Sequence, residues 1–448
     1  MRRERHGGNL VPIARRLWAV KTPRSRVPAN RVNHDGGNTP PLSTQVAQVA
    51  TRSRRFLPSG LEAGTAPEDR KFRPDVEGLR AVAVLLVVLY HARISPFTGG
   101  YVGVDVFFVI SGFVITGLLL RERTASGHTS LLSFYARRCR RILPAASLVV
   151  VATLWATYHW LGFLRGDEVV DDARSSALFF ANFHFISLQT NYLTAQRPPS
   201  PLQNLWSLSV EEQFYLVYPA FFIVLAFLAR RWWSLRAALV TALSLVIASS
   251  LAWSIYETST DATTAYFSPF THAWELALGA LVAVGTSRLA SLPKGIAAAI
   301  TWLGLAAIIV SATVYDDTTT YPGSAVALPV VATAAVIAGG AAIPRLGAES
   351  LLGISAMQLL GRLSFSLYLW HWPLLAIATE RGAHTLSTTS ALLWVGCALL
   401  LSYVTFRLIE DPIRRARPLS RRPLLSIAVG ALLVAGVLAV ATLELRTN

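Results

Sequence analysis

An arginine and a histidine occupy the two ends of one apolar stretch, "GLRAVAVLLVVLYH", which covers residues 78–91. Arg80 and His91 are eleven residues apart. Because eleven steps of 100° return to within about 20° of the start, both side chains face the same way on a helix, roughly 16 Å apart along its axis. A guanidinium can hold an anion and an imidazole can take a proton, so this pair could perform chemistry. The alternatives are a snorkelling arginine and an interfacial histidine.

Two further stretches place carboxylates in apolar surroundings. Asp105 lies in "GGYVGVDVFFVISGF", and an acidic group at membrane depth needs a partner, for which we expect Arg80 or His91. An aspartate that orients a histidine supports its action as a base, so Asp105 is a catalytic candidate, with a purely structural aspartate as the alternative. Glu211 and Glu212 in "LWSLSVEEQFYLVYP" point about 100° apart. At most one should face the interior, and the other can sit at the N-terminal turn of its helix.

Four arginines fall within "FYARRCRRILP", residues 134–144. Arg138 and Arg141 are three residues apart and share one helix face, and Arg137 and Arg140 share another. Paired guanidinium groups suit the oxygens of phosphates. Anchoring of the helix at a membrane surface by positive charge is the alternative.

Histidine and tyrosine stand beside tryptophan in "GRLSFSLYLWHWPLL". An aromatic belt at a membrane surface explains the tryptophans but not His371. We predict that Tyr368, His371 and Tyr215 contact a substrate. His272 and Glu275, in "SPFTHAWELALGALVA", form a further pair at a spacing of three.

These residues must be positioned by membrane helices. The chain has 448 residues, of which 53% are hydrophobic and 15% charged, and its mean hydropathy is +0.46. A soluble enzyme of this length would carry far more charge. Since a span needs roughly 20 apolar residues, the sequence predicts an all-α, polytopic transmembrane helix bundle of about 11 spans. The predicted spans are residues 78–94, 102–120, 144–162, 213–229, 236–255, 267–285, 295–314, 324–342, 362–378, 389–406 and 423–442.

The basic residues of the loops predict the orientation. With the N-terminus in the cytoplasm, most loop arginines and lysines fall on the cytoplasmic side, as the positive-inside rule requires. This assignment holds only if the apolar residues 175–188 do not cross, and they are shorter than the roughly 17-residue minimum. We expect them to form a re-entrant or interfacial helix within a folded outer loop, residues 163–212. The predicted location is the cell inner (plasma) membrane, with multiple passes through the lipid bilayer.

The motifs quoted above, with "WELALGAL" and "IEDPIRR", occur in the order typical of the acyltransferase 3 family, which the sequence resembles over residues 72–412. The resemblance implies an integral membrane O-acyltransferase. Such an enzyme moves an acyl group, commonly acetyl, from cytoplasmic acyl-CoA to a hydroxyl of an extracytoplasmic glycan, glycolipid or secreted metabolite.

The resemblance also implies roles for individual residues. His91 would be the catalytic base, and Glu211 would orient it or relay protons. Arg80, Arg138 and Arg141 would hold the acyl-CoA, which is the donor substrate.

The sequence departs from the family pattern at two places. Many relatives carry an arginine where this chain has His272, which weakens a fixed-charge role at that position. Some relatives continue into an SGNH hydrolase-like domain outside the membrane. Here we expect only a basic linker and an additional transmembrane helix, residues 413–448.

Other functions stay open at this point. A proton-coupled transporter of a small polar solute would also contain intramembrane arginine, histidine and acidic residues, although it does not need the R-x-x-R spacing. Residues 1–71 form a predicted disordered basic cytoplasmic tail, which either binds anionic lipid or is simply solvated. Cys139 and Cys397 lie far apart, so they indicate no cysteine metal site. We expect no metal cofactor, and no fold element indicates a nucleic-acid partner.

Overall fold

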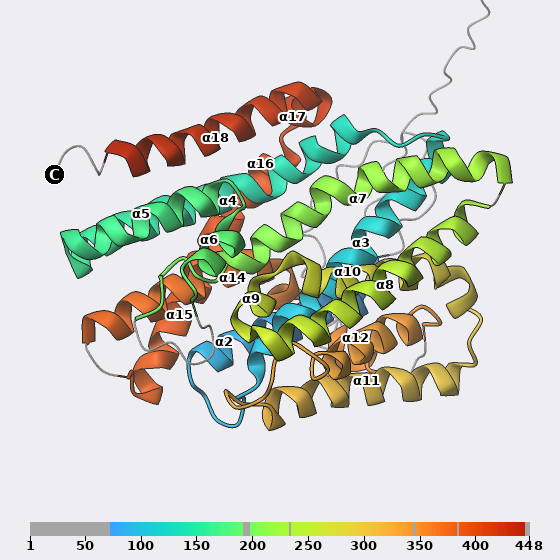
Figure 1. Cartoon of the computed structure of the whole chain (residues 1–448), viewed down its shortest axis with the longest axis horizontal. Helices are drawn as coiled ribbons and strands as arrows, with labels where there is room; N and C mark the ends of the chain where they lie inside the picture. Colours follow the sequence, from blue (N-terminus) through green and yellow to red (C-terminus); the bar gives the residue numbers. More distant parts are fainter. Residues whose placement is uncertain (1–71, 191–197, 233, 344–345, 383–384, 444–448) are drawn as a thin grey trace, which may run out of the picture. The chain divides into compact units, whose positions relative to one another are not determined.

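The computed structural model describes residues 72–190, 198–232, 234–343, 346–382 and 385–443 (Figure 1). Over these residues it contains helices and connecting turns and no strand, which confirms the predicted all-α class. The predicted tail, residues 1–71, lies outside the described residues. By internal contacts the chain divides between Arg70 and Lys71, and all described residues belong to the second unit.

The elements of this unit are, in chain order, α2 (Pro74–His91), the 3-10 turn η1 (Gly100–Val102), α3 (Gly103–Ser126), α4 (Leu131–Leu161), α5 (Phe163–Ala177), α6 (Ala181–Ser187), α7 (Leu205–Trp232), α8 (Leu235–Thr260), α9 (Ala262–Phe267), α10 (Pro269–Leu289), α11 (Lys294–Val314), α12 (Ala327–Gly340), α13 (Glu349–Leu352), α14 (Ser355–Gly382), α15 (Thr388–Thr405), the π-helical turn η2 (Phe406–Glu410), α16 (Asp411–Arg415), α17 (Arg417–Arg421) and α18 (Pro423–Leu443).

Each of the eleven predicted spans falls on a helix of this unit. Within the described residues, 7 helices are long and apolar enough to cross a membrane, which makes this a multi-pass membrane protein. Three of the remaining predicted spans, α2, α10 and α14, carry the polar side chains discussed below, and α12 has only 14 residues. The total of eleven crossings and the side of the N-terminus therefore stay predictions.

The helices that carry polar side chains pack against one another at the centre of the unit. α2 lies against α14 and α3, and α3 lies against α10. Two glycines bring α3 and α10 into backbone contact. A Cβ at Gly112 would lie 1.8 Å from the carbonyl oxygen of Leu276, and one at Gly279 would lie 1.9 Å from that of Val109. Small residues permit such close approach of membrane helices.

The predicted outer loop is folded, and its apolar segment is not a span. Residues 175–188 are divided between the end of α5 and the seven residues of α6. The break contains Phe179, whose φ of 56° is left-handed. An apolar side chain rarely adopts this conformation, and it prevents one continuous helix. The segment is therefore not one continuous helix, and its place in an outer loop stays a prediction.

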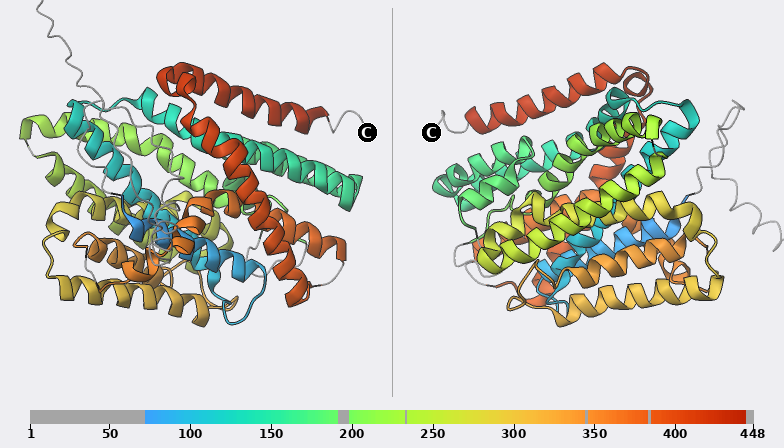
Figure 2. Two further views of the ribbon diagram at one scale, coloured as in Figure 1. Left: turned by 180° about the vertical axis from the view of Figure 1, so that it is seen from behind. Right: turned by 45° about the vertical axis from the view of Figure 1, so that its right-hand side comes forward.

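Helix α4 is longer than predicted and is braced by α18. The predicted span began at residue 144, but the helix begins at Leu131 and runs through Pro144, so the four arginines are part of it. Arg140 donates from Nη1 to Ser426 Oγ at 2.8 Å and to the carbonyl oxygen of Leu419 at 3.1 Å. Figure 2 shows α18 along the outer side of α4 in both views. The C-terminal helix thus supports the arginine-bearing helix.

Because α3 and α10 are in close contact, we expect that adding one methyl group at Gly279 lowers the stability of the protein. Gly279→Ala should lower stability by about 1–3 kcal/mol, because the new Cβ overlaps the Val109 carbonyl and the helices must separate. Gly396→Ala, on α15, is the matched control, since a Cβ there meets open space. It should be neutral or stabilising by up to about 1 kcal/mol. Thermal unfolding of both variants in the same detergent gives the comparison, and equal melting temperatures would contradict the predicted overlap.

Candidate active site

Helix α14 contacts both Arg80 and His91, the two residues at the ends of one face of α2. Arg80 donates from Nη2 to Ser364 Oγ at 2.9 Å, and His91 Nδ1 lies 2.9 Å from His371 Nε2. Ser364 and His371 are seven residues apart, which is two turns of α14. The predicted shared facing of Arg80 and His91 is confirmed, because both side chains meet the same neighbouring helix.

The contacts of His371 determine which nitrogen of His91 can act as a base. His371 Nδ1 lies 3.1 Å from the carbonyl oxygen of Leu367, which can only accept, so Nδ1 carries a proton. His371 is fully buried, and burial disfavours a charged ring. In the neutral ring Nε2 must accept, so His91 donates its Nδ1 proton to it. The lone pair of a neutral His91 is then on Nε2.

His91 lines a cavity of about 450 Å³, here called the histidine cavity. Its ring centre lies 4.5 Å from that of Trp372, which also lines the cavity. Gln203 is buried, and its Oε1 has no hydrogen-bond partner among the described residues. A cavity lined by an aromatic ring and by polar side chains such as Gln203 suits a polyhydroxyl ligand. The remaining lining residues are Tyr90, Arg93, Ile94, Ser95, Phe97, Thr98, Pro199, Asp316 and Asp317.

A second cavity, of about 200 Å³, is lined by all three arginines predicted to bind the donor and is here called the arginine cavity. It lies at the Arg80 end of the α2 face, and His91 is not among its lining residues. Besides Arg80, Arg138 and Arg141 it is lined by Val76, Glu77, Val104, Phe107, Phe108, Ile110, Ser111, Val114, Ser207, Leu208, Glu211, Tyr215, Ser364, Phe365 and Tyr368.

Arg138 is held by acidic and aromatic groups of α7. Its Nη2 donates to Glu212 Oε1 at 2.8 Å and lies 3.7 Å from Glu211 Oε1. Its guanidinium carbon lies 3.6 Å from the centre of the Tyr215 ring, a distance at which cation–π attraction is strong. Arg138 therefore joins α4 to α7 as well as lining the cavity.

Arg141 differs from its two neighbours. Within the described ranges it makes no hydrogen bond or ion pair, whereas Arg80 bonds Ser364 and also lies 3.5 Å from Glu77. A guanidinium has five N–H donors in a planar fork. An arginine that leaves this fork unused inside a cavity is placed to bind an anion such as a phosphate.

Glu211 is fixed in the arginine cavity. Its Oε1 accepts from the Ser111 hydroxyl at 2.7 Å and from the Tyr215 hydroxyl at 2.5 Å. Glu211 and Glu212 both face the interior, since Arg138 contacts both. The expectation that one of them occupies the N-terminal turn is wrong, because α7 already begins at Leu205.

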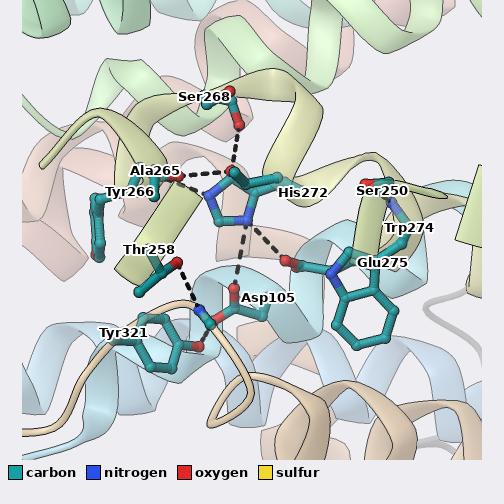
Figure 3. A network of polar contacts seen from close by, with 12 residues as sticks. Asp105, Ser250, Thr258, Ala265, Tyr266, Ser268, His272, Trp274, Glu275 and Tyr321 are labelled. Carbon is teal, nitrogen blue, oxygen red and sulfur yellow. Dashed lines mark hydrogen bonds and ion pairs between the residues drawn. The ribbon is translucent and has the colours of Figure 1, made fainter. Parts of the chain in front are cut away.

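Asp105 belongs to a different cluster. It accepts a hydrogen bond from the Tyr321 hydroxyl, and its Oδ1 lies 3.8 Å from His272 Nδ1 (Figure 3). The predicted pairing with Arg80 or His91 is wrong. The reason is that Asp105 lies on the side of α3 that faces α10. It does not lie on the side that faces Arg80 and His91 of α2.

The three predicted substrate-binding residues lie at or beside the arginine cavity. Tyr215 and Tyr368 line it. Tyr368 also shares a hydrogen bond of 2.6 Å with Ser207 Oγ, and its ring centre lies 5.5 Å from that of His371. His371 is buried behind His91. Tyr368 and His371 therefore form one layer of side chains between the arginine cavity and His91.

Ser364, Gln203 and Glu410 are among the polar residues of the site that were missed from the sequence. Ser364 and Gln203 are small or neutral polar residues without a spacing signal. Glu410 is buried, accepts from Ser366 Oγ at 2.9 Å, and interacts electrostatically with Arg141 and Arg80. It lies in the "IEDPIRR" motif and on a π-helical turn, a feature frequent at functional sites.

This multi-pass helix bundle places His91, held by His371, at one end of α2 and a cluster of guanidinium groups at the other end, beside two separate cavities. The chain belongs to the acyltransferase 3 family, whose acyltransferase domain matches residues 73–407. The match covers the described bundle from the start of α2 to the start of η2.

Curated relatives extend this assignment. The chain is 31% identical over 373 residues to the peptidoglycan O-acetyltransferase OatA of Listeria monocytogenes, covering 78% of this chain and 57% of the relative. It is 32% identical to YrhL of Bacillus subtilis, covering 79% and 57%, and 29% identical to the O-acetyltransferase OatA of Staphylococcus aureus, covering 77% and 58%. The chain therefore spans less than two thirds of the length of these relatives. No solved structure matches it.

Proposed function

We propose that the chain is a membrane O-acetyltransferase that takes acetyl groups from acetyl-CoA and transfers them to hydroxyls of an extracytoplasmic glycan. The observation that carries the proposal is the unused guanidinium fork of Arg141 in a cavity shared with Arg80 and Arg138. A guanidinium fork with unused N–H donors suits the phosphates of a nucleotide-bearing donor. The names of the relatives support acetyl as the group and peptidoglycan as the first acceptor to test.

The proposed orientation puts the N-terminus in the cytoplasm, with about 11 spans in the plasma membrane. Its support is the excess of basic residues in the loops that this orientation places inside. The arginine cavity would then be reached by acetyl-CoA from the cytoplasm, and the histidine cavity by the glycan from outside.

In the proposed mechanism, His91 Nε2 takes the proton of the acceptor hydroxyl while the hydroxyl oxygen attacks the thioester carbonyl. The carbonyl carbon then releases the sulfur of CoA as the C–S bond breaks. The proton on His91 passes to this sulfur, so the products are the acetyl ester and CoA-SH. His371 contributes by holding His91 with its lone pair on Nε2.

In the proposed mechanism, the donor would pass the Tyr368 side chain, which lines the arginine cavity and contacts His371. Its hydroxyl is fixed by Ser207 and by the carbonyl oxygen of Asn204 at 2.9 Å. For the thioester to reach His91, this ring has to turn aside. Entry of the pantetheine arm would supply the contacts that replace those of the ring.

The proposal is tested with membrane vesicles of known orientation. Inside-out vesicles that enclose an N-acetylglucosamine oligosaccharide should transfer label from external acetyl-CoA to the enclosed sugar, and sealed right-side-out vesicles should not. His91→Ala should remove this transfer, with a loss of at least about 100-fold for a missing general base. Equal transfer by His91→Ala and the unaltered chain would refute the mechanism. Transfer only in right-side-out vesicles would reverse the orientation.

If the arginine cavity binds the donor, substitution of Arg141 should weaken the binding of acetyl-CoA selectively. Arg141→Ala should raise the KM for acetyl-CoA at least about 10-fold, since a charge-assisted hydrogen bond contributes about 1.5–3 kcal/mol. Arg141→Lys should restore this only in part, because a point charge does not reproduce the fork. Arg137→Ala is the control, as Arg137 bonds Glu122 at 2.8 Å and does not line the cavity. Equal KM values for the two alanine variants would contradict the assignment.

Substitutions of His371 test whether its hydrogen bond with His91 is needed for the proposed reaction. In His371→Gln the amide oxygen can occupy the place of Nε2 and still accept from His91, so kcat should stay within about 10-fold. In His371→Asn the shorter side chain can bond Leu367 but cannot reach His91, so kcat should fall at least about 100-fold. The KM for acetyl-CoA should change little in either variant. Equal kcat values for Gln and Asn would show that His371 acts only by packing.

A further inference from the structure

A second cluster of ionisable residues lies outside both cavities. Asp105 comes from α3, and His272 and Glu275 come from consecutive turns of α10 (Figure 3). Their exposed fractions are 2%, 1% and 0%, so water does not solvate them. Two carboxylates buried together keep their charges only if positive charge lies close by, and otherwise take up protons.

The possible ligand atoms of the three side chains lie close together. His272 Nδ1 lies 2.7 Å from Glu275 Oε1 and 3.8 Å from Asp105 Oδ1. One ligand atom from each residue lies within 4.8 Å of the other two. A nitrogen and two carboxylate oxygens at these separations can be bridged by a single cation, because metal–ligand bonds of this kind measure about 2.0–2.2 Å.

In His272 and Asp105, the polar atom that faces away from the cluster already has a hydrogen bond. His272 Nε2 donates to the carbonyl oxygen of Tyr266 at 2.9 Å, so a neutral His272 carries its lone pair on Nδ1, toward the carboxylates. Asp105 accepts from the Tyr321 hydroxyl with its other oxygen. Metal-binding histidines and carboxylates are oriented by outer bonds of the same kind.

One acceptor in the cluster has no bond. Glu275 Oε2 is buried and has no hydrogen-bond partner among the described residues. If only a proton were shared between His272 and Glu275, this oxygen would stay without a partner, at a cost comparable to a lost hydrogen bond. A cation bound by the whole carboxylate would use it. A divalent ion would also balance the two acidic charges.

We propose that Asp105, His272 and Glu275 bind one divalent transition-metal ion of the zinc, manganese or iron class. A ligand set with an imidazole nitrogen favours these ions over calcium and magnesium, which prefer oxygen ligands alone. The ion joins α3 to α10, and through Tyr321 it also joins the connection between α11 and α12. The rings of Phe108 and Trp206 lie 5.2 Å and 5.5 Å from the His272 ring and exclude water.

The first measurement is the metal content of the full chain. It is expressed with zinc, manganese or iron supplied in turn, purified without metal-affinity resin, and analysed by mass spectrometry of the elements. One of the three ions should be present at about one per chain. Glu275→Gln should lose it. Asp172→Asn is the control, because Asp172 bonds His184 at 2.8 Å in a histidine–carboxylate pair elsewhere, and its metal content should equal that of the unaltered chain.

The second measurement separates a metal from a shared proton. A glutamine at position 275 can donate its N–H to His272 Nδ1 and so copies a protonated glutamate. A cluster held by a proton would leave the melting temperature of Glu275→Gln unchanged, whereas loss of a bound metal should lower it by at least about 5 °C. Asp105→Asn, which still accepts from Tyr321, is the second variant and should also lose the metal. A metal-free unaltered chain under all three supplements would overturn the proposal.

Discussion

The contact between α2 and α14 is the constraint on which the rest of the site depends. It fixes Arg80 through Ser364 and His91 through His371. Both are pairs between side chains on helices that pack along their length, so the separation of the two groups is set by helical rise. A loop could not hold an arginine and a histidine roughly 16 Å apart with this consistency.

The contact between α3 and α10 supports α2 from the other side. Gly112 and Gly279 let these two helices approach until their backbones touch, which leaves no room for lipid or water between them. Asp105, His272 and Glu275 lie in this same interface. A bound cation there would therefore add its attraction at a place where packing is already close and the dielectric is low.

Helical periodicity explains which parts of the site could be predicted from the sequence. The shared face of Arg80 and His91, and the shared face of Arg138 and Arg141, follow from spacing within one helix, and the structure has both. The partner of Asp105 does not follow, because it depends on which helix lies opposite. Tyr321 is 216 residues away along the chain, and no local pattern relates the two. The same limit applies to the positions of Tyr368 and Tyr215.

The layer formed by Tyr368 and His371 gives a physical reason for dividing the site into two cavities. Under the proposed function, a thioester open to both cavities would meet water and could be hydrolysed, whereas a closed layer would exclude water until the proposed donor is bound. His371 is suited to this position because it is buried and bonded at both nitrogens. In the proposed mechanism, the residue that orients the base would therefore also be part of the barrier. Opening this barrier at Tyr368, and not at His371, would leave the His91 tautomer unchanged while the proposed donor enters.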